Sequence, residues 1–322
     1  MKGSVLSAGL VLVLASIGGV EGHIAMWNKG LFGYNYPGQA GDSKQYYNGN
    51  AVVAPLRKFD NLTESDWFAH GMKAYPPVAG DFMELVSGSN YTAELACNRA
   101  WTSMRDPSET KKLNTYACPE VGPMHTMNQL GKPPALKWLG GTAIAIAYTS
   151  DEQAVKPNDF TVISVNYTSV WYRETVYQIP QGMPECPKGG CLCTWNWYHL
   201  SGNGEGYGNE FYNTLYRCTV TGATSSRNSI PLGAAHLPQL CPTNQTCNAG
   251  PKMPMYTFLD SGMNIIPDPP KNPTYNARYG FSDGAQTDIF TVSADSGGFK
   301  LLPSVLASAL AVLLVVLASS IF

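Results

Sequence analysis

The chain has 322 residues, a formal net charge of −2 and 14% charged residues. It contains no block of basic residues, so its charge pattern argues against a nucleic-acid partner. Its eight cysteines and its many glycines and prolines are typical of a disulfide-bonded protein of the secretory pathway.

Residues 1–22 have the layout of a signal peptide. One lysine precedes a short apolar run, which is followed by small residues up to Gly22. This order is typical of a secretory signal, and the run is shorter than the ~20 apolar residues that a membrane-spanning helix needs. Cleavage after Gly22 makes His23 the first residue of the mature chain, while Ala15 and Gly19 offer other small-residue positions for the cut.

The body of the chain, residues 23–290, contains short runs that favour β-strands. They alternate apolar and polar residues or are rich in β-branched and aromatic ones, and turn residues separate them. These runs cover residues 92–97, 142–150, 160–179, 194–200 and 211–222. Because long amphipathic helices are absent from the pattern, the sequence predicts an all-β fold, an antiparallel β-sandwich with long loops.

The eight cysteines all lie in the body, and their even number behind a secretory signal predicts disulfides. The alternative, a zinc site around Cys191 and Cys193, lacks the matched C-x₂₋₄-C pairs of zinc ribbons. The cysteines are Cys97, Cys118, Cys186, Cys191, Cys193, Cys218, Cys241 and Cys247. Four Asn-x-Thr sequons, at Asn61, Asn90, Asn166 and Asn244, predict N-glycans on surface loops.

The C-terminal segment predicts a glycolipid anchor. Residues 301–322 carry no charge and end at the chain terminus, behind a spacer and the small residues around Ser293, Asp295 and Ser296. We therefore expect a linker with the attachment residue over 291–304 and a tail removed on anchoring over 305–322. A transmembrane helix is the alternative, which the lack of Lys or Arg after the apolar run disfavours. The anchor places the protein at the outer face of the plasma membrane or in the cell wall.

A histidine at the first position predicts a copper site. The α-amine, with a pKa of ~8, and the imidazole of His23 can chelate one metal ion together. One further imidazole gives three nitrogens in a T shape, an arrangement that suits Cu(II). His125 on a loop bounded by Gly and Pro is the candidate for that imidazole, and His70 is its competitor.

The run over 211–222 offers an axial ligand. Tyr212 can supply a phenol, and Glu210 shares its face because residues two apart on a strand point the same way. We expect Glu210 and His199 to orient oxygen species and to control protons around the metal. The alternative interpretation makes Tyr212 a core residue and Glu210 an exposed strand residue.

Motifs over nearly all of residues 23–290 resemble, in order, those of fungal lytic polysaccharide monooxygenases of auxiliary-activity family 14. The motifs are HIAMWNKGLFGYN, WFAHG, TAELACN, the histidine of PMHT, AIAYTSD, DFTVISVNYTSVWYR, MPECPKGGCLCTWNWYH, YRCTVTGAT and YGFSDGAQTDIF. The resemblance implies an immunoglobulin-like β-sandwich, one copper ion per chain, and oxidative cleavage of xylan on cellulose.

The resemblance also assigns roles to single residues. It implies a copper brace of His23 and His125 with Tyr212 in the axial position, and it matches His199 to a family histidine. His70 matches a histidine that is not a ligand, and Glu210 replaces a glutamine.

The disulfides that the resemblance implies are Cys97–Cys118, Cys186–Cys191, Cys193–Cys218 and Cys241–Cys247. A further pair found in some members falls on Thr142 and Ser169, so that bridge is lost here. The loop between Cys193 and Cys218 is longer than in the family, which makes Tyr207 an alternative to Tyr212.

Function follows from the resemblance as a hypothesis. We expect a monomeric copper enzyme that uses peroxide or dioxygen and an external electron donor to cleave xylan or another wall polysaccharide. Trp27, Tyr34 and Tyr207 are candidate sugar contacts. A glycoside hydrolase would need an acid pair, whereas Glu94 and Glu174 read as ordinary strand residues. The remaining alternative, favoured by the anchor, is a non-catalytic cell-surface protein of copper homeostasis.

Overall fold

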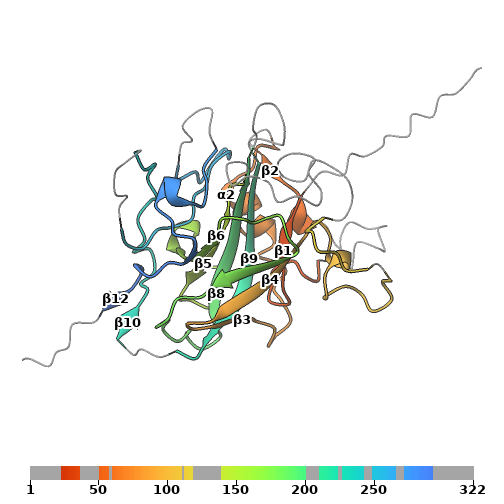
Figure 1. The fold of residues 1–322 in the computed structure, drawn as a ribbon, viewed down its shortest axis with the longest axis horizontal. Helices are drawn as coiled ribbons and strands as arrows, with labels where there is room; N and C mark the ends of the chain where they lie inside the picture. Colours follow the sequence, from red (N-terminus) through yellow and green to blue (C-terminus); the bar gives the residue numbers. More distant parts are fainter. Residues whose placement is uncertain are drawn as a thin grey trace, which may run out of the picture. The chain divides into compact units, whose positions relative to one another are not determined.

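The computed structural model describes residues 23–36, 51–57, 60–110, 112–118, 139–200, 210–223, 227–242, 249–265 and 272–292. These residues form an all-β sandwich, as predicted. The small sheet has the order β1 (Ala25–Trp27), β4 (Asn90–Ala96) and β7 (Glu174–Gln178). The main sheet has the order β11 (Gly284–Ala285), β6 (Thr161–Asn166), β5 (Thr142–Ala147), β8 (Cys191–His199), β9 (Glu210–Thr221) and β2 (Leu56–Arg57) (Figure 1).

The remaining elements are short. β3 (Met83–Val86) pairs with β9 in the parallel sense, and β10 (Asn228–Ser229) pairs with β12 (Thr291–Val292). The only α-helix among the described residues is α2 (Glu64–Trp67). The 3-10 turns are η1 (Ala51–Val53), η3 (Phe68–Gly71), η4 (Arg99–Trp101), η6 (Pro157–Asp159) and η7 (Ala277–Tyr279).

The expected run over 160–179 is two strands in different sheets. β6 belongs to the main sheet and β7 to the small sheet, and a turn with Ser169 and Val170 lies between them. The strands that the sequence patterns do not predict have two to four residues, and they are β1, β2, β3, β10, β11 and β12. Such segments are too short to show a period-two alternation.

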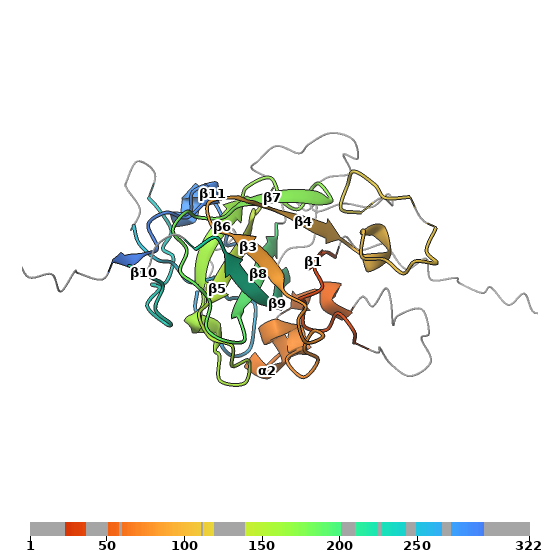
Figure 2. The same cartoon turned by 90° about the horizontal axis from the view of Figure 1, so that it is seen from below.

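The main sheet is buried on both of its faces. One core cluster, with Met26, Leu95, Ile146 and Trp195, fills the space between the two sheets. The other cluster packs α2 and irregular segments against the opposite face, and Figure 2 shows β4 and β7 on one side of the main sheet and α2 on the other. All nine residues of β8 are therefore buried, as a strand covered on both faces requires.

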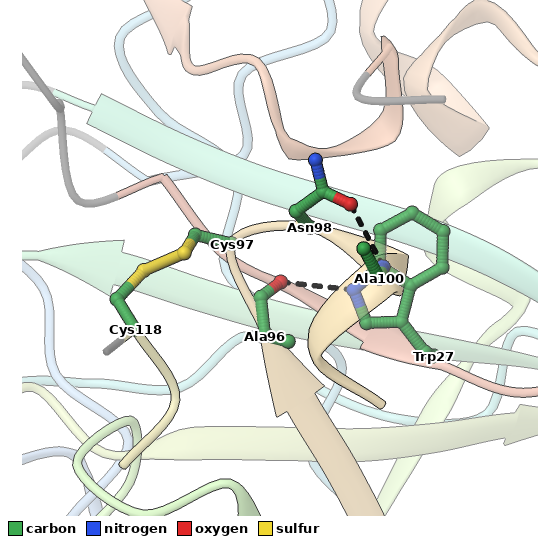
Figure 3. The surroundings of a disulfide bond; sticks show 6 residues. All are labelled: Trp27, Ala96, Cys97, Asn98, Ala100 and Cys118. Atoms are coloured by element: carbon green, nitrogen blue, oxygen red, sulfur yellow. Dashed lines mark hydrogen bonds between the residues drawn. A yellow bond between two sulfur atoms is a disulfide. The ribbon is translucent and has the colours of Figure 1, made fainter. Parts of the chain in front are cut away.

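Disulfides cross-link strands and loops of this fold. The structure contains Cys97–Cys118, Cys186–Cys191 and Cys193–Cys218, the pairs that the resemblance implies, and Cys241 is also disulfide-bonded. Cys247, its expected partner, lies outside the described ranges. Figure 3 shows Cys97–Cys118 next to the end of β4, where the Trp27 indole N–H donates to the Ala96 carbonyl at 2.9 Å. Closing a loop of this length stabilises the fold by roughly 3 kcal/mol.

The glycan acceptors differ in exposure. Asn61 and Asn90 are exposed, whereas Asn166 is half-buried and donates from its side-chain amide to the Val176 carbonyl at 3.0 Å. Asn244 lies outside the part of the chain that the structure describes. Within the described ranges, no helix has the length and apolar character that crossing a membrane requires.

Candidate metal centre

The site begins with His23, which directly precedes β1. Antiparallel pairing sets Ala25 opposite Ala96, so the start of β1 lies beside the end of β4. The Tyr216 hydroxyl on β9 donates to the Met26 carbonyl at 2.6 Å and thereby ties β1 to the main sheet. As a result, the imidazole of His23 lies 6.4 Å from the ring of Tyr212, measured between centroids.

Tyr212 and Glu210 share one face of β9, as the period of two predicts. The Tyr212 hydroxyl donates to Glu210 Oε2 at 2.9 Å. Tyr212 is fully buried and Glu210 is 3% exposed, so the expectation that Glu210 is an exposed strand residue is wrong. A carboxylate in this position accepts the phenol proton in a hydrogen bond and fixes the direction of the phenol oxygen.

Trp197 lies beneath this pair and was missed by the sequence analysis. It is the register partner of Tyr212 across β8 and β9, and the two rings stack at 4.4 Å with an interplanar angle of 25°. His199 is the register partner of Glu210 and lies 5.3 Å from the Trp197 ring. The signal in the sequence was the spacing of two between Trp197 and His199, which places both on one strand face.

The donor set of these residues fits copper. The imidazole of His23 lies near the phenol of Tyr212, which is bonded to the carboxylate of Glu210, while the sulfurs of the described cysteines are bonded in disulfides. Nitrogen and oxygen donors without thiolate suit Cu(II). The α-amine of His23 becomes a donor only when residues 1–22 are removed. His125 falls in a segment that the structure does not describe. Among the described residues, no cluster of three or more His, Cys, Asp or Glu forms a metal site.

His70, the competitor of His125, lies on the other side of β9. The Ala69 amide donates to the Asn213 side-chain oxygen at 2.8 Å, and Asn213 points away from the face of its neighbour Tyr212. Burial lowers the pKa of His70 to about 4, although hydrogen bonds with the backbone of Asn213 and Ala54 act in the opposite direction. His70 therefore packs behind the sheet and does not approach the His23–Tyr212 pair.

Other residues named by the sequence analysis have structural roles. Trp27 is 2% exposed and its indole N–H is bonded to Ala96, so packing accounts for it. The carbonyl of Tyr34 accepts from Arg99 at 2.9 Å, and the Arg99 guanidinium lies 4.5 Å from the Tyr34 ring centroid. Tyr207 lies outside the described ranges.

The two acidic residues, and the two positions to which the resemblance assigns a further disulfide, have contacts of their own. Glu94 and Glu174 both bind Arg173, which is an ion-pair arrangement and not an acid pair around a scissile bond. Thr142 shares a hydrogen bond of 2.5 Å with the Tyr177 hydroxyl, and Ser169 is 2% exposed. Both polar side chains are buried.

Comparison with known proteins agrees with this geometry. The family model "Lytic polysaccharide monooxygenase AA14" matches residues 5–320. The AA14 family lytic polysaccharide monooxygenase B of Pycnoporus cinnabarinus is 36% identical over 295 residues, which cover 86% of this chain and 72% of that protein. The B enzyme of Trametes coccinea is 36% identical over 306 residues, covering 89% and 67%. The chain therefore belongs to the AA14 family of lytic polysaccharide monooxygenases, copper-dependent oxidoreductases that cleave polysaccharides oxidatively.

Proposed function

We propose that the mature chain begins at His23 and holds one copper ion. The ligands are the α-amine and imidazole of His23, the imidazole of His125 and, in the axial position, the phenol of Tyr212. The observation that carries this proposal is the proximity of the His23 and Tyr212 rings, whose centroids lie 6.4 Å apart, because it puts an imidazole and a phenol within reach of one metal ion. Bound copper supplies one-electron redox chemistry for activating peroxide or dioxygen.

Side chains around the proposed copper position would hold the metal and control proton transfer there. The hydrogen bond to Glu210 and the stack on Trp197 hold the phenol of Tyr212, which would be one of the groups that hold the copper ion. Glu210 keeps a carboxylate in a buried place, where it can hold or release a proton for oxygen species. His199 is fully buried and is the register partner of Glu210, and its role in the proposal is to orient oxygen species together with that carboxylate.

The substrate we propose is xylan on cellulose or another wall polysaccharide, with peroxide or dioxygen as oxidant and a small reductant or redox protein as electron donor. A small net charge of −2 suits an enzyme that meets an uncharged polymer, and we propose that the enzyme is secreted and monomeric. The uncharged C-terminal segment supports a glycolipid tether through Ser293, Asp295 or Ser296. Such a tether directs the activity to polymers at the cell's own surface.

The decisive experiment combines metal binding with product analysis. Mature protein starting at His23 is loaded with copper and incubated with reductant, peroxide and xylan-coated cellulose, chitin or fungal glucan. Oxidised oligosaccharides from one of these polymers identify the substrate. Tight copper binding without products from any polymer would instead support copper handling. His125→Ala should abolish tight copper binding, and unchanged affinity in that variant would refute the ligand assignment.

A further inference from the structure

A groove lies at the β7 edge of the small sheet, two strands away from β1. Six residues line it, namely Leu113, Asn114, Thr115, Tyr172, Arg173 and Glu174. Its volume is about 290 Å³, near the lower end of the range for small-ligand sites. None of these residues belongs to the copper site described above.

The groove has an aromatic wall that is supported from behind. Residues 115–117 pair with residues 171–173, through Arg173 N–H to Thr115 O at 2.9 Å and Ala117 N–H to Trp171 O at 3.2 Å. This pairing stacks Tyr116 on Tyr172 at 6.0 Å and 21°. Tyr172 lines the groove while Tyr116 does not, so the second ring holds the first one in place. A ring fixed in this way can bind a ligand with little loss of conformational entropy.

The polar side of the groove is equally fixed. The Arg173 guanidinium donates to the Asn114 carbonyl at 2.8 Å and to Glu174 Oε1 at 2.5 Å, and it also binds Glu94. The side chain of Arg173 is therefore 12% exposed, whereas that of Glu174 is 61% exposed. A carboxylate accepts more than one hydrogen bond, so Glu174 can bind a ligand hydroxyl while it holds Arg173.

The groove lies at the same end of the sandwich as His23. Arg173 accepts from the Leu95 amide at 2.7 Å, and Leu95 is the register partner of Met26. Arg173 is therefore two strands across the sheet and three residues along the strand from His23. With ~4.8 Å between strands and a rise of ~3.3 Å per residue, the two residues are roughly 14 Å apart. A few pyranose units of an extended chain cover that distance.

We propose that this groove is a distal polysaccharide-binding subsite, which takes a neutral β-linked pyranose of a chain whose scissile bond lies at the copper. The inference rests on the proposed function. A pyranose has an apolar C–H face and a rim of hydroxyls, and the groove offers an aromatic ring beside fixed donors and acceptors. Tyr172 stacks on the sugar face, and Glu174 and the Asn114 amide bind the hydroxyls.

The test measures binding of xylohexaose and cellohexaose to the mature copper-loaded protein by calorimetry. Tyr172→Ala should weaken binding of the preferred oligosaccharide about tenfold, which corresponds to ~1.4 kcal/mol. Tyr172→Phe keeps the ring and should stay within twofold of the wild type. Glu174→Ala, at an exposed position, should weaken binding about threefold even if Tyr172→Ala folds poorly. Tyr75→Ala, which removes an exposed tyrosine elsewhere, is the matched control and should bind normally.

The outcomes separate the subsite from the catalytic proposal. Binding that depends on Tyr172 and Glu174, in a protein that yields no oxidised product, keeps the subsite and removes the proposed function. Wild-type affinity in both Tyr172→Ala and Glu174→Ala overturns the subsite, even if xylan is oxidised. Absence of any oligosaccharide binding, or an equal loss in Tyr75→Ala, overturns it as well. His23→Ala should abolish copper binding and leave oligosaccharide affinity within twofold.

Discussion

The hydrogen bond from Tyr212 to Glu210 can be tested by removing a single oxygen atom. In Tyr212→Phe the ring remains and keeps its 4.4 Å stack on Trp197, so no large cavity forms. The variant loses only the 2.9 Å hydrogen bond to a carboxylate that is 3% exposed. Because hydrogen bonds to charged groups contribute roughly 1.5–3 kcal/mol, the free energy of unfolding should fall by about that amount.

Tyr216→Phe is the matched control on the same strand. Tyr216 is also fully buried, and its hydroxyl donates to the neutral Met26 carbonyl at 2.6 Å. The hydroxyl also shares a 2.7 Å hydrogen bond with Thr214 Oγ1. Both partners are neutral, so Tyr216→Phe should cost roughly 1–2 kcal/mol for the two hydrogen bonds together. The change at Tyr212 should alter the copper electron paramagnetic resonance spectrum more than the change at Tyr216, because Tyr212 is a proposed ligand whereas Tyr216 acts only through the position of β1.

The assay is urea unfolding of the metal-free mature protein, followed by tryptophan fluorescence, for both single variants and for Glu210→Gln with and without Tyr212→Phe. The double-mutant cycle isolates the coupling between Tyr212 and Glu210. An unfolding free energy for Tyr212→Phe within ~0.5 kcal/mol of the wild type would refute the hydrogen-bond argument. An equal spectral change in Tyr216→Phe would refute the axial assignment.

Three further predictions concern pH, backbone and metal. The pKa of His70 in the folded protein, about 4, lies below its ordinary value of 6.5. The unfolded chain therefore takes up the proton first, and roughly 3 kcal/mol of stability is lost as pH falls from 6.5 to 4. His70→Asn should flatten this part of the plot of urea midpoint against pH, and an unchanged slope would contradict the argument. Gly141→Ala should lower the free energy of unfolding by about 3 kcal/mol or more, because φ is +66° and the new Cβ would lie 2.3 Å from the Tyr275 carbonyl oxygen. Gly80→Ala is the control, since φ is +95° but no atom lies within 4 Å of the new Cβ. In the same unfolding assay it should cost only about 1–2 kcal/mol of backbone strain. One alanine added before His23 should abolish the rise in melting temperature that copper produces, a stabilisation of about 4 kcal/mol at a thousandfold excess over Kd; a retained shift would show that the α-amine is not a ligand.

The sequence predicted the face that Glu210 and Tyr212 share because strand periodicity is a local property. It did not predict that Trp197 supports Tyr212, because this contact depends on the register between β8 and β9. A slip of one residue would place a different side chain under the phenol. The location of His70 depends on the contact of Ala69 with Asn213, 144 residues away along the chain, which no local pattern encodes.

The burial of the donors also explains how copper binding relates to folding. Tyr212 and Trp197 belong to the core between the sheets, and β1 is held by Trp27 and by the Tyr216 hydrogen bond. These contacts involve no metal, so His23 and Tyr212 are brought together by packing that the sequence supplies alone. In small zinc domains, the free energy of metal binding supplies the free energy of folding. In this chain the core contacts around Tyr212 and β1 involve protein groups alone, so we expect copper to add stability by mass action on the folded protein.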